Sequence, residues 1–259
     1  MKNIKIIVAA HKKYKMPDGT IYLPLHVGAE GKEPIGYNKD NEGENISALN
    51  PYFCELTGLY WAWKNLQFDY IGLAHYRRHF SFKRKGDKWH SVLNDTEAQQ
   101  LCQNYDIILP AKRRYYIETL YSHYAHTFDA KHLDATGEIL QEKFPDYIPF
   151  FDKVVKQTSG YMFNMFIMKK ELVSDYCSFL FPLLFDLQQR VEYKNLSPFH
   201  ARLFGRVSEI IFNVWLAKKM ADDRNLRVKV IGTLHMESIN WWQKGWQFLA
   251  AKFLGKKYC

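Results

Sequence analysis

The residues best suited to chemistry are His75, Tyr76, Arg77 and Arg78, which directly follow the apolar run 70–74. Such a run is typical of a strand buried on both faces, so the four side chains should lie at its carboxyl end. Ligands of open α/β sheets bind in the crevice at that end. Guanidinium groups bind phosphate oxygens in pairs of hydrogen bonds and would stabilise a departing diphosphate. The alternative is that both arginines pair with surface carboxylates.

Two glutamates could serve in proton transfer or ligand binding. Glu209 follows the segment 205–208, whose glycine and serine predict a turn and a helix cap. A carboxylate there could deprotonate a hydroxyl group, or it could only offset the helix dipole. Glu55 lies on one face of an expected helix, and if it is buried it needs a polar partner. That partner is a ligand hydroxyl or a structural salt bridge.

Three further polar residues lie in or beside expected strands. Asn164 interrupts the aromatic and methionine-rich run 160–168. A buried amide in a strand bonds either to neighbouring backbone or to a ligand. His11 and Lys12 follow the apolar run 4–10, where they could contact a base or a phosphate.

The elements that position these residues alternate between strands and helices. Expected strands, with weaker signals for the second and last, cover residues 4–10, 21–27, 70–74, 105–110, 160–168 and 228–231. Expected helices cover residues 50–65, 170–190 and 208–220, the first with Asn50 as cap and Pro51 at the first helical position. This alternation predicts an α/β fold with a mainly parallel central sheet flanked by helices.

Several well-known motifs are missing. The sequence holds no Gly-x-Gly-x-x-Gly, no phosphate-binding P-loop and no Gly-x-Ser-x-Gly, which argues against dinucleotide-binding, P-loop and serine-hydrolase functions. Its four cysteines form no Cys-x-x-Cys pair, which argues against a structural zinc site. No Asp-x-Asp pair follows a strong strand, where a nucleotide-sugar enzyme would usually hold a divalent metal.

The charge balance narrows the range of partners. The 259 residues carry a formal net charge of +9, which suits nucleic acid, anionic lipid or a phosphorylated small molecule. The basic residues are mostly spread along the chain, whereas a nucleic-acid-binding protein more often concentrates them on one element. We therefore expect no nucleic-acid partner.

The segment 239–259 differs from the rest of the chain, because tryptophan, phenylalanine and leucine alternate there with lysine. This pattern predicts an amphipathic helix that contacts an anionic membrane surface, or one that docks on the preceding domain. No signal peptide and no run of eighteen apolar residues is visible. We expect a cytoplasmic protein, peripheral at the inner face of the plasma membrane, with a domain over residues 1–238.

Four sets of motifs resemble a family of capsular and exopolysaccharide synthesis proteins known as domain of unknown function 4422. They lie, in order, at residues 45–65, 71–78, 164–168 together with 176–181, and 205–209. The resemblance covers most of residues 4–220. It implies a glycosyltransferase with a single GT-A-like domain, and some members are similar to β-galactofuranosyltransferases. Those enzymes invert configuration and use UDP-galactofuranose in O-antigen or galactan synthesis.

The resemblance also implies roles for individual residues. Glu209 would be the catalytic base, and Asn164 and Arg206 would lie near the acceptor or the sugar. The donor and its diphosphate would contact His11, Lys12, Asn45, Glu55, His75, Tyr76, Arg77 and Arg78. The cluster at residues 75–78 stands where other GT-A enzymes hold a metal ion, so it either replaces the metal or uses His75 to bind a divalent cation such as Mn²⁺.

Other functions remain open from the sequence. The donor could be another UDP-sugar, such as UDP-galactopyranose, and the acceptor a free or lipid-linked glycan. A non-catalytic scaffold of a polysaccharide assembly complex would bind no UDP. A nucleic-acid-binding protein would instead show binding that depends steeply on salt.

Overall fold

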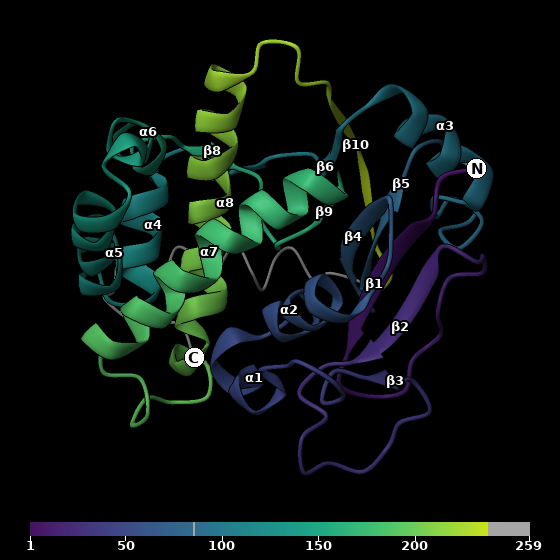
Figure 1. The fold of residues 1–259 in the computed structure, drawn as a ribbon, viewed down its shortest axis with the longest axis horizontal. Helices are drawn as coiled ribbons and strands as arrows, with labels where there is room; N and C mark the ends of the chain where they lie inside the picture. The colour runs from purple at the N-terminus through teal and green to yellow at the C-terminus, as the bar shows by residue number, and fades with distance from the viewer. Residues whose placement is uncertain (85, 238–259) are drawn as a thin grey trace.

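The apolar runs of the sequence form an eight-stranded sheet, in a computed structural model that describes residues 1–84 and 86–237 (Figure 1). In spatial order the strands are β3 (Asn38–Lys39), β2 (Tyr22–His26), β1 (Ile4–Ala10), β4 (Tyr70–His75), β5 (Arg78–Ser81), β10 (Val228–His235), β6 (Ile107–Pro110) and β9 (Phe166–Lys169). A separate two-stranded pairing joins β7 (Arg113–Arg114) to β8 (Ser159–Gly160).

The sheet is parallel in one half and mixed in the other. Strands β3, β2, β1 and β4 pair in parallel, as expected for the runs 21–27, 4–10 and 70–74, although the sequence predicts no strand at β3. Beyond them β4 pairs antiparallel with both β5 and β9, and β10 and β6 complete a closed ring of five strands. The prediction of a mainly parallel sheet is therefore wrong for this half. Only Tyr76 and Arg77 separate β4 from β5, and a parallel connection needs a dozen residues or more.

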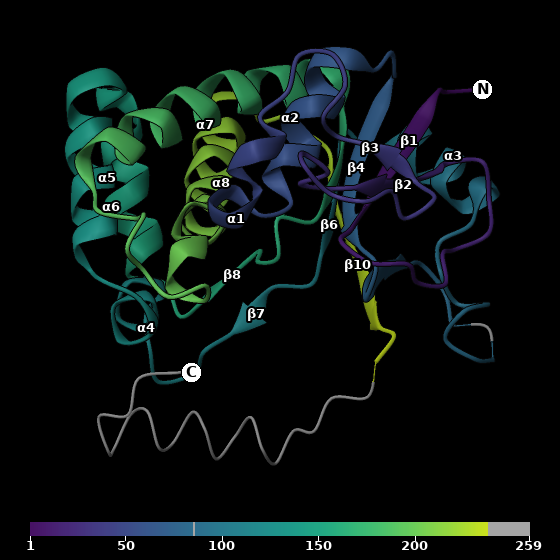
Figure 2. The same cartoon turned by 90° about the horizontal axis from the view of Figure 1, so that it is seen from below.

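Helices cover both faces of the sheet. The helices are α1 (Asn50–Phe53), α2 (Leu56–Asn65), α3 (Asp95–Asn104), α4 (Leu120–Thr127), α5 (Lys131–Lys143), α6 (Ile148–Val155), α7 (Lys170–Arg190) and α8 (Leu203–Asp222), with the short 3₁₀ turns η1 (Ser47–Leu49), η2 (Pro145–Tyr147) and η3 (His200–Arg202). Figures 1 and 2 show α1, α2, α7 and α8 on one face and α3 on the other. Helices α5 and α6 pack against α7 and α8, on the side away from the sheet, and α4 packs against α6.

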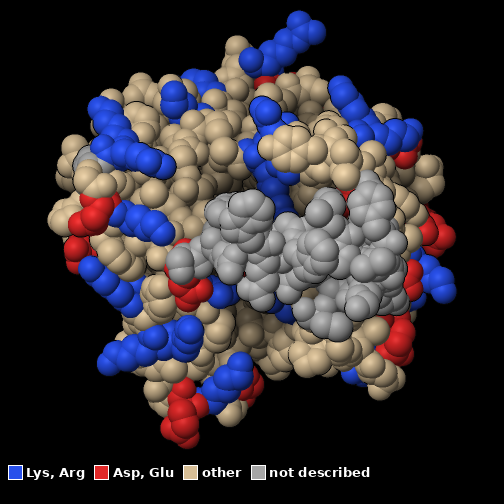
Figure 3. Space-filling view, turned by 180° about the vertical axis from the view of Figure 1, so that it is seen from behind, with Lys and Arg blue, Asp and Glu red and all other residues tan. Residues whose placement is uncertain are grey.

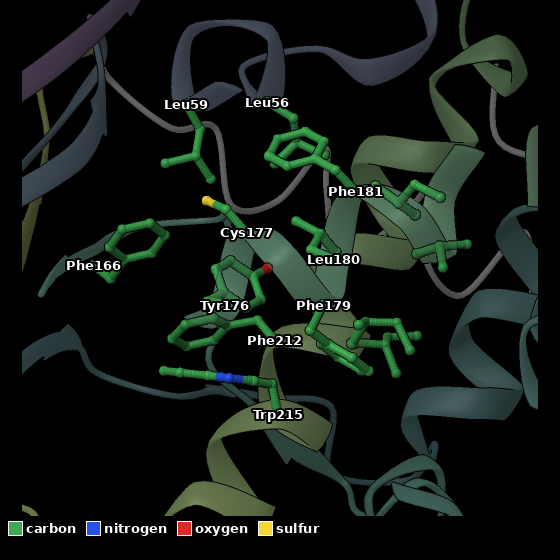
Figure 4. Close-up of a cluster of buried hydrophobic side chains, with 14 of the residues drawn as sticks. Leu56, Leu59, Phe166, Tyr176, Cys177, Phe179, Leu180, Phe181, Phe212 and Trp215 are labelled. Carbon is green, nitrogen blue, oxygen red and sulfur yellow. The ribbon is translucent and has the colours of Figure 1, made fainter. Parts of the chain in front are cut away.

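The core divides into two layers because side chains alternate along the strands. In β1, Ile7 faces the layer beneath α2, α7 and α8, whereas Ile6 and Val8 face α3. The larger layer is rich in aromatic rings, among them Tyr176 and Trp215, whose rings are 5.1 Å apart (Figure 4). Burying such side chains contributes roughly 1.5–3 kcal/mol each, so α7 and α8 are held firmly against the sheet.

The expected helix over residues 50–65 is broken in two. Cys54 adopts a φ of 55°, which ends α1 and redirects the chain into α2. Asn50 is not the expected cap. Its side-chain amide instead donates to the Cys54 carbonyl at 2.7 Å and to the Thr57 hydroxyl at 3.2 Å, across the break. As a result Glu55 stands at the corner, immediately before α2.

Helix α8 begins earlier than its sequence predicts. The helix starts at Leu203, so Gly205 and Ser208 lie inside it rather than forming a turn and a cap. The glycine is there for close packing: a β-carbon at Gly205 would lie 3.1 Å from the Cys54 sulfur and 3.4 Å from the Phe53 carbonyl oxygen. Two segments that hold candidate site residues thus meet at Gly205.

Among the described residues, no helix is long and apolar enough to cross a membrane. The amphipathic helix expected over residues 239–259 lies outside the described residues, as does the boundary expected at residue 238.

Candidate functional site

A buried hydrogen-bond network lies at the carboxyl end of β4. The side-chain amide of Asn164 donates to Glu55 Oε1 at 2.7 Å and to the Gly205 carbonyl at 3.1 Å. The Ser208 hydroxyl donates to Asn164 Oδ1 at 3.0 Å. Asn164 and Glu55 are 4% and 8% exposed, so these bonds are shielded from water. The network joins the corner before α2, the turn before β9 and the first turns of α8.

The turn that carries Asn164 is conformationally unusual. Phe163 and Asn164 both have left-handed backbones, with φ values of 75° and 52°. Such conformations cost of the order of 1–3 kcal/mol each and persist only where surrounding contacts impose them. His75 supplies one such contact, since its Nε2 lies 2.7 Å from the Phe163 carbonyl and must donate to it. The run 160–168 is therefore two short strands with a shaped turn between them, and not one strand as expected.

Glu209 is the most deeply buried carboxylate of the site, with 4% of its surface exposed. Its Oε1 accepts a hydrogen bond from Arg206 Nη1 at 3.0 Å. Burial raises the pKa of Glu209, the charge of Arg206 opposes that rise, and nearby Glu55 adds to it. Glu209 lies in the second turn of α8, beyond the first turn where the helix dipole acts most strongly. A carboxylate with a raised pKa is a better proton acceptor near neutral pH.

The two adjacent arginines point to different surroundings. Arg78 is half-buried: its guanidinium lies 4.2 Å from the centre of the Phe163 ring, and its Nε donates to His235 Nδ1 at 3.3 Å. Burial lowers the pKa of Arg78, and the charge of Glu209 counteracts this. Arg77 is 49% exposed and forms a 3.2 Å ion pair with Glu237. The surface-pair alternative thus describes Arg77, whereas Arg78 lies beside the buried network.

A second, cationic part of the site lies at the end of β1. The His11 and Tyr76 rings meet edge to face at 5.2 Å, and the Lys12 ammonium lies 5.6 Å from the Tyr76 ring centre. The pKa of His11 is lowered, first by its burial and then by surrounding positive charges. Those charges belong to Arg77, Lys12, Arg202 and Lys32. Such a concentration of cations favours an anionic ligand.

Lys and Arg side chains also lie in several separate places on the face shown in Figure 3. This dispersed pattern differs from the single basic stripe typical of proteins that bind nucleic acid.

Asn45 is not brought into the network. Its side chain accepts a hydrogen bond from the Ser47 amide at 3.1 Å and donates to the Gly43 carbonyl at 2.9 Å, within its own loop. The neighbouring Asp40 is fully buried and accepts bonds from the backbone amides of Gly28 and Ala29. This loop is held together by Asp40, so its polar residues have structural partners.

The surroundings of His75 are not those of a metal site. Within the described residues, no group of three or more His, Cys, Asp or Glu side chains could hold a metal ion. His75 Nε2 faces a carbonyl oxygen and lies 3.9 Å from Glu55 Oε1. The described side chains around His75 therefore do not fit a divalent cation.

Sequence reasoning missed three contributors to the site. The sequence predicts a helix cap at Ser208, but the Ser208 hydroxyl donates to Asn164 instead. Arg202 and Cys54 are the other two contributors. Arg202 Nε donates to the Cys54 sulfur at 3.2 Å, next to Glu55. Burial raises the pKa of the Cys54 thiol to about 11. The spacing of Arg202 and Arg206, four residues apart and thus on one helical face, was the available signal.

Comparisons with known proteins identify the family of the chain and a solved structure with a similar fold. A family model described as a domain of unknown function, DUF4422, matches residues 5–220. The mixed α/β fold is similar to the apo structure of the WbbM bifunctional glycosyltransferase, with a TM-score of 0.84 and 30% sequence identity. That similarity covers 91% of this chain and 46% of WbbM, so the chain spans about half the length of that protein. No curated protein matched. The chain belongs to the DUF4422 family.

Proposed function

We propose that this protein is an inverting glycosyltransferase of bacterial polysaccharide synthesis. It would transfer galactofuranose from UDP-galactofuranose to a hydroxyl group of a free or lipid-linked glycan at the inner face of the plasma membrane. One observation carries the proposal: buried Glu209, with its raised pKa, lies in the same site as Arg78 and Arg206. The 30% identity to a protein described as a glycosyltransferase supports the same reaction class.

The reaction is a single displacement at the anomeric carbon of the donor sugar. The acceptor oxygen forms a bond to that carbon while the bond to the diphosphate oxygen breaks, and the electron pair leaves with UDP. Glu209 accepts the proton of the attacking hydroxyl. Arg206 keeps Glu209 ionised and oriented through their 3.0 Å contact.

The departing UDP gains negative charge as the bond breaks. Arg78, supported by the Phe163 ring, stabilises this charge from the side of the buried network. Lys12 and Arg77, which lie against the Tyr76 ring, act from the end of β1, and the neutral His11 ring can add a hydrogen bond there. Cations held in fixed positions stabilise the transition state more than the ground state.

Glu55 and Asn164 orient the donor sugar. Asn164 fixes one carboxylate oxygen of Glu55, and a carboxylate retains the capacity to accept further bonds from sugar hydroxyls. His75 acts indirectly, because its bond to the Phe163 carbonyl holds the turn on which Asn164 stands. Asn45 belongs to a neighbouring loop, and we assign it to the outer, nucleotide end of the donor site.

A screen of UDP-sugars against glycan acceptors tests the proposal, with the product linkage determined by NMR. Galactofuranose transfer with inversion is the expected result, and transfer of galactopyranose instead would revise the donor alone. Calorimetry with UDP separates the rival classes. A scaffold or a nucleic-acid-binding protein would bind no UDP, and that result would overturn the enzyme assignment.

A further inference from the structure

A pocket of about 550 Å³ opens between α5, the end of α7 and the loop that leads to η3. Its volume lies in the range of small-ligand sites. The lining residues are Phe128, Asp129, Lys131, His132, Asp134, Ala135, Glu138, Arg190, Val191, Glu192, Leu196 and His200. We propose that this pocket binds neutral sugar residues of the acceptor glycan, behind the hydroxyl that reacts. This inference rests on the proposed function and names a subsite for its substrate.

Two structural elements connect the pocket to the buried network. The turn η3 contributes His200 to the pocket wall, and two residues later Arg202 bonds to Cys54 beside Glu55. Successive α-carbons are about 3.8 Å apart, so these two side chains arise within roughly 8 Å of each other. A glycan in the pocket therefore lies within a few sugar lengths of the reacting centre.

Helix α4 makes the second connection. The hydroxyl of Tyr124 lies 3.0 Å from Nδ1 of His132, a residue of the pocket wall. Burial raises the pKa of Tyr124, and the charge of Arg206 opposes that rise, so the phenol also lies within electrostatic reach of the network. Tyr124 thus lies behind the pocket wall, on the side of the pocket that faces Arg206.

The charge of the pocket distinguishes it from the donor site. Four of its lining residues are acidic and two, Lys131 and Arg190, are basic. Arg190 is already engaged, since its guanidinium contacts Glu142 at 2.9 Å and Asp186 at 3.1 Å. An acidic lining repels a nucleotide diphosphate, and the cationic end of β1 suits that ligand better. The carboxylates of the lining accept hydrogen bonds well, as a neutral ligand with many hydroxyl groups requires.

The lining also combines oriented carboxylates with an aromatic wall. Asp134 Oδ1 accepts a bond from the Tyr121 hydroxyl at 2.7 Å, and Glu192 Oε1 accepts one from the Lys194 amide at 2.9 Å. Phe128 is the phenylalanine of the lining, and stacking contacts with Tyr124 and Phe199, at centroid distances of 5.1 Å and 5.3 Å, hold its ring in place. Rigid apolar surface beside oriented polar groups matches the two faces of a sugar ring.

Acceptor length provides the test. Ala135→Trp would fill the pocket, and Gln141→Trp, exposed on the same helix and outside the lining, is the matched control. With a galactan hexasaccharide as acceptor, Ala135→Trp should raise KM about tenfold. With a methyl galactoside, and for the UDP-sugar donor, KM should stay at the wild-type value. An equal change for both acceptors, or no change, would overturn the subsite.

A second variant guards against misfolding caused by the bulky tryptophan. Asp129→Asn combined with Glu138→Gln removes two carboxylates with almost no change in volume, and should weaken hexasaccharide binding several-fold. Saturation-transfer NMR with the hexasaccharide alone measures that binding without turnover. Loss of the signal in both pocket variants supports the subsite even if no UDP-sugar is transferred. If the protein transfers sugar from a UDP-sugar but both variants bind the hexasaccharide as tightly as the wild type, the subsite is rejected and the enzyme assignment stands.

Discussion

The side-chain amide of Asn164 lies 2.7 Å from the carboxylate of Glu55, a residue 109 positions earlier in the chain. This bond neutralises part of the cost of burying Glu55 and fixes the direction of its carboxylate. Asn164→Ala should therefore destabilise the fold by roughly 1–3 kcal/mol, because it leaves buried polar groups unpaired. Turnover should fall by more than the loss of stability can explain.

Urea unfolding and steady-state kinetics check this prediction together. Asn65→Ala is the matched control, since Asn65 also makes side-chain bonds to backbone groups but stands at the far end of α2. The control should lose stability and keep its turnover. Equal turnover in the two variants would remove Asn164 from the site.

Glu209→Gln tests the catalytic base. The amide keeps the shape of the side chain but cannot accept the proton, so kcat should fall by about 10²–10⁴. Calorimetric affinity for UDP should persist. Glu97→Gln is the control, because Glu97 is also buried but belongs to the cap of α3 on the opposite face of the sheet. Turnover near the wild-type value in Glu209→Gln would show that the base lies elsewhere.

The pH dependence of turnover should report the environment of Glu209. The base must be ionised, and its pKa is raised, so kcat/KM should fall on the acid side at a higher pH than an ordinary glutamate gives. Removing the positive charge in Arg206→Met disfavours the ionised form further, and should move this acid limb to higher pH. Arg206→Lys keeps the charge and should move it less. An acid limb that is the same in all three proteins would contradict the assignment.

Adjacent arginines should contribute unequally to UDP binding. Arg78→Ala removes a half-buried guanidinium beside the network and should weaken UDP binding about tenfold or more, a change of about 1.4 kcal/mol. Arg77 is exposed and paired with Glu237, so Arg77→Ala should have a smaller effect that shrinks further at high salt. Calorimetry at two salt concentrations measures both. The reverse order of effects would place the diphosphate on the exposed side of β5.

Acid should destabilise the fold through His79. This side chain is 0% exposed, and burial lowers its pKa to about 4, so the folded protein holds it neutral. The unfolded chain protonates it near pH 6.5, and stability is therefore complete above that pH and declines as the pH falls from 6.5 to 4. The loss from this group approaches roughly 3 kcal/mol, since each pKa unit is worth about 1.4 kcal/mol.

His79→Phe should remove part of this decline, as measured by urea unfolding at pH 7.5 and pH 4.5. The exposed His90 provides the control variant, His90→Phe, which should keep the wild-type difference between the two pH values. The same difference in both variants would mean that other groups cause the acid sensitivity.

Much of the fold followed from apolar patterning. The buried run 4–10 became β1, and the expected helix 170–190 matches α7 at both ends. The breaks at Cys54, Phe163 and Asn164 could not be predicted in this way. Their left-handed backbones are imposed by tertiary contacts, and two of the three residue types give no local sign of such a turn.

For the candidate site, the sequence indicates the residue types better than the contacts between their side chains. His75, Arg78 and Glu209 are candidates from the sequence alone, because charged or polar side chains beside buried strands and helices stand out. Their partners did not stand out. Ser208 and Gly205 have ordinary explanations as a cap and a turn, and only the packing of α8 against Cys54 reveals their place.

The closed ring formed by β4, β5, β10, β6 and β9 has a consequence for solubility. Unpaired edge strands are templates for aggregation, and a ring offers none. In the described part of the main sheet, the open side is formed by β2 and by β3, which is only two residues long. Pro24 stands in the stretch of β2 that β3 leaves uncovered, where it presents no amide hydrogen to an incoming strand. The main sheet therefore offers another chain little free edge for strand addition, because one half is closed and the edge of the other half is short and interrupted by proline.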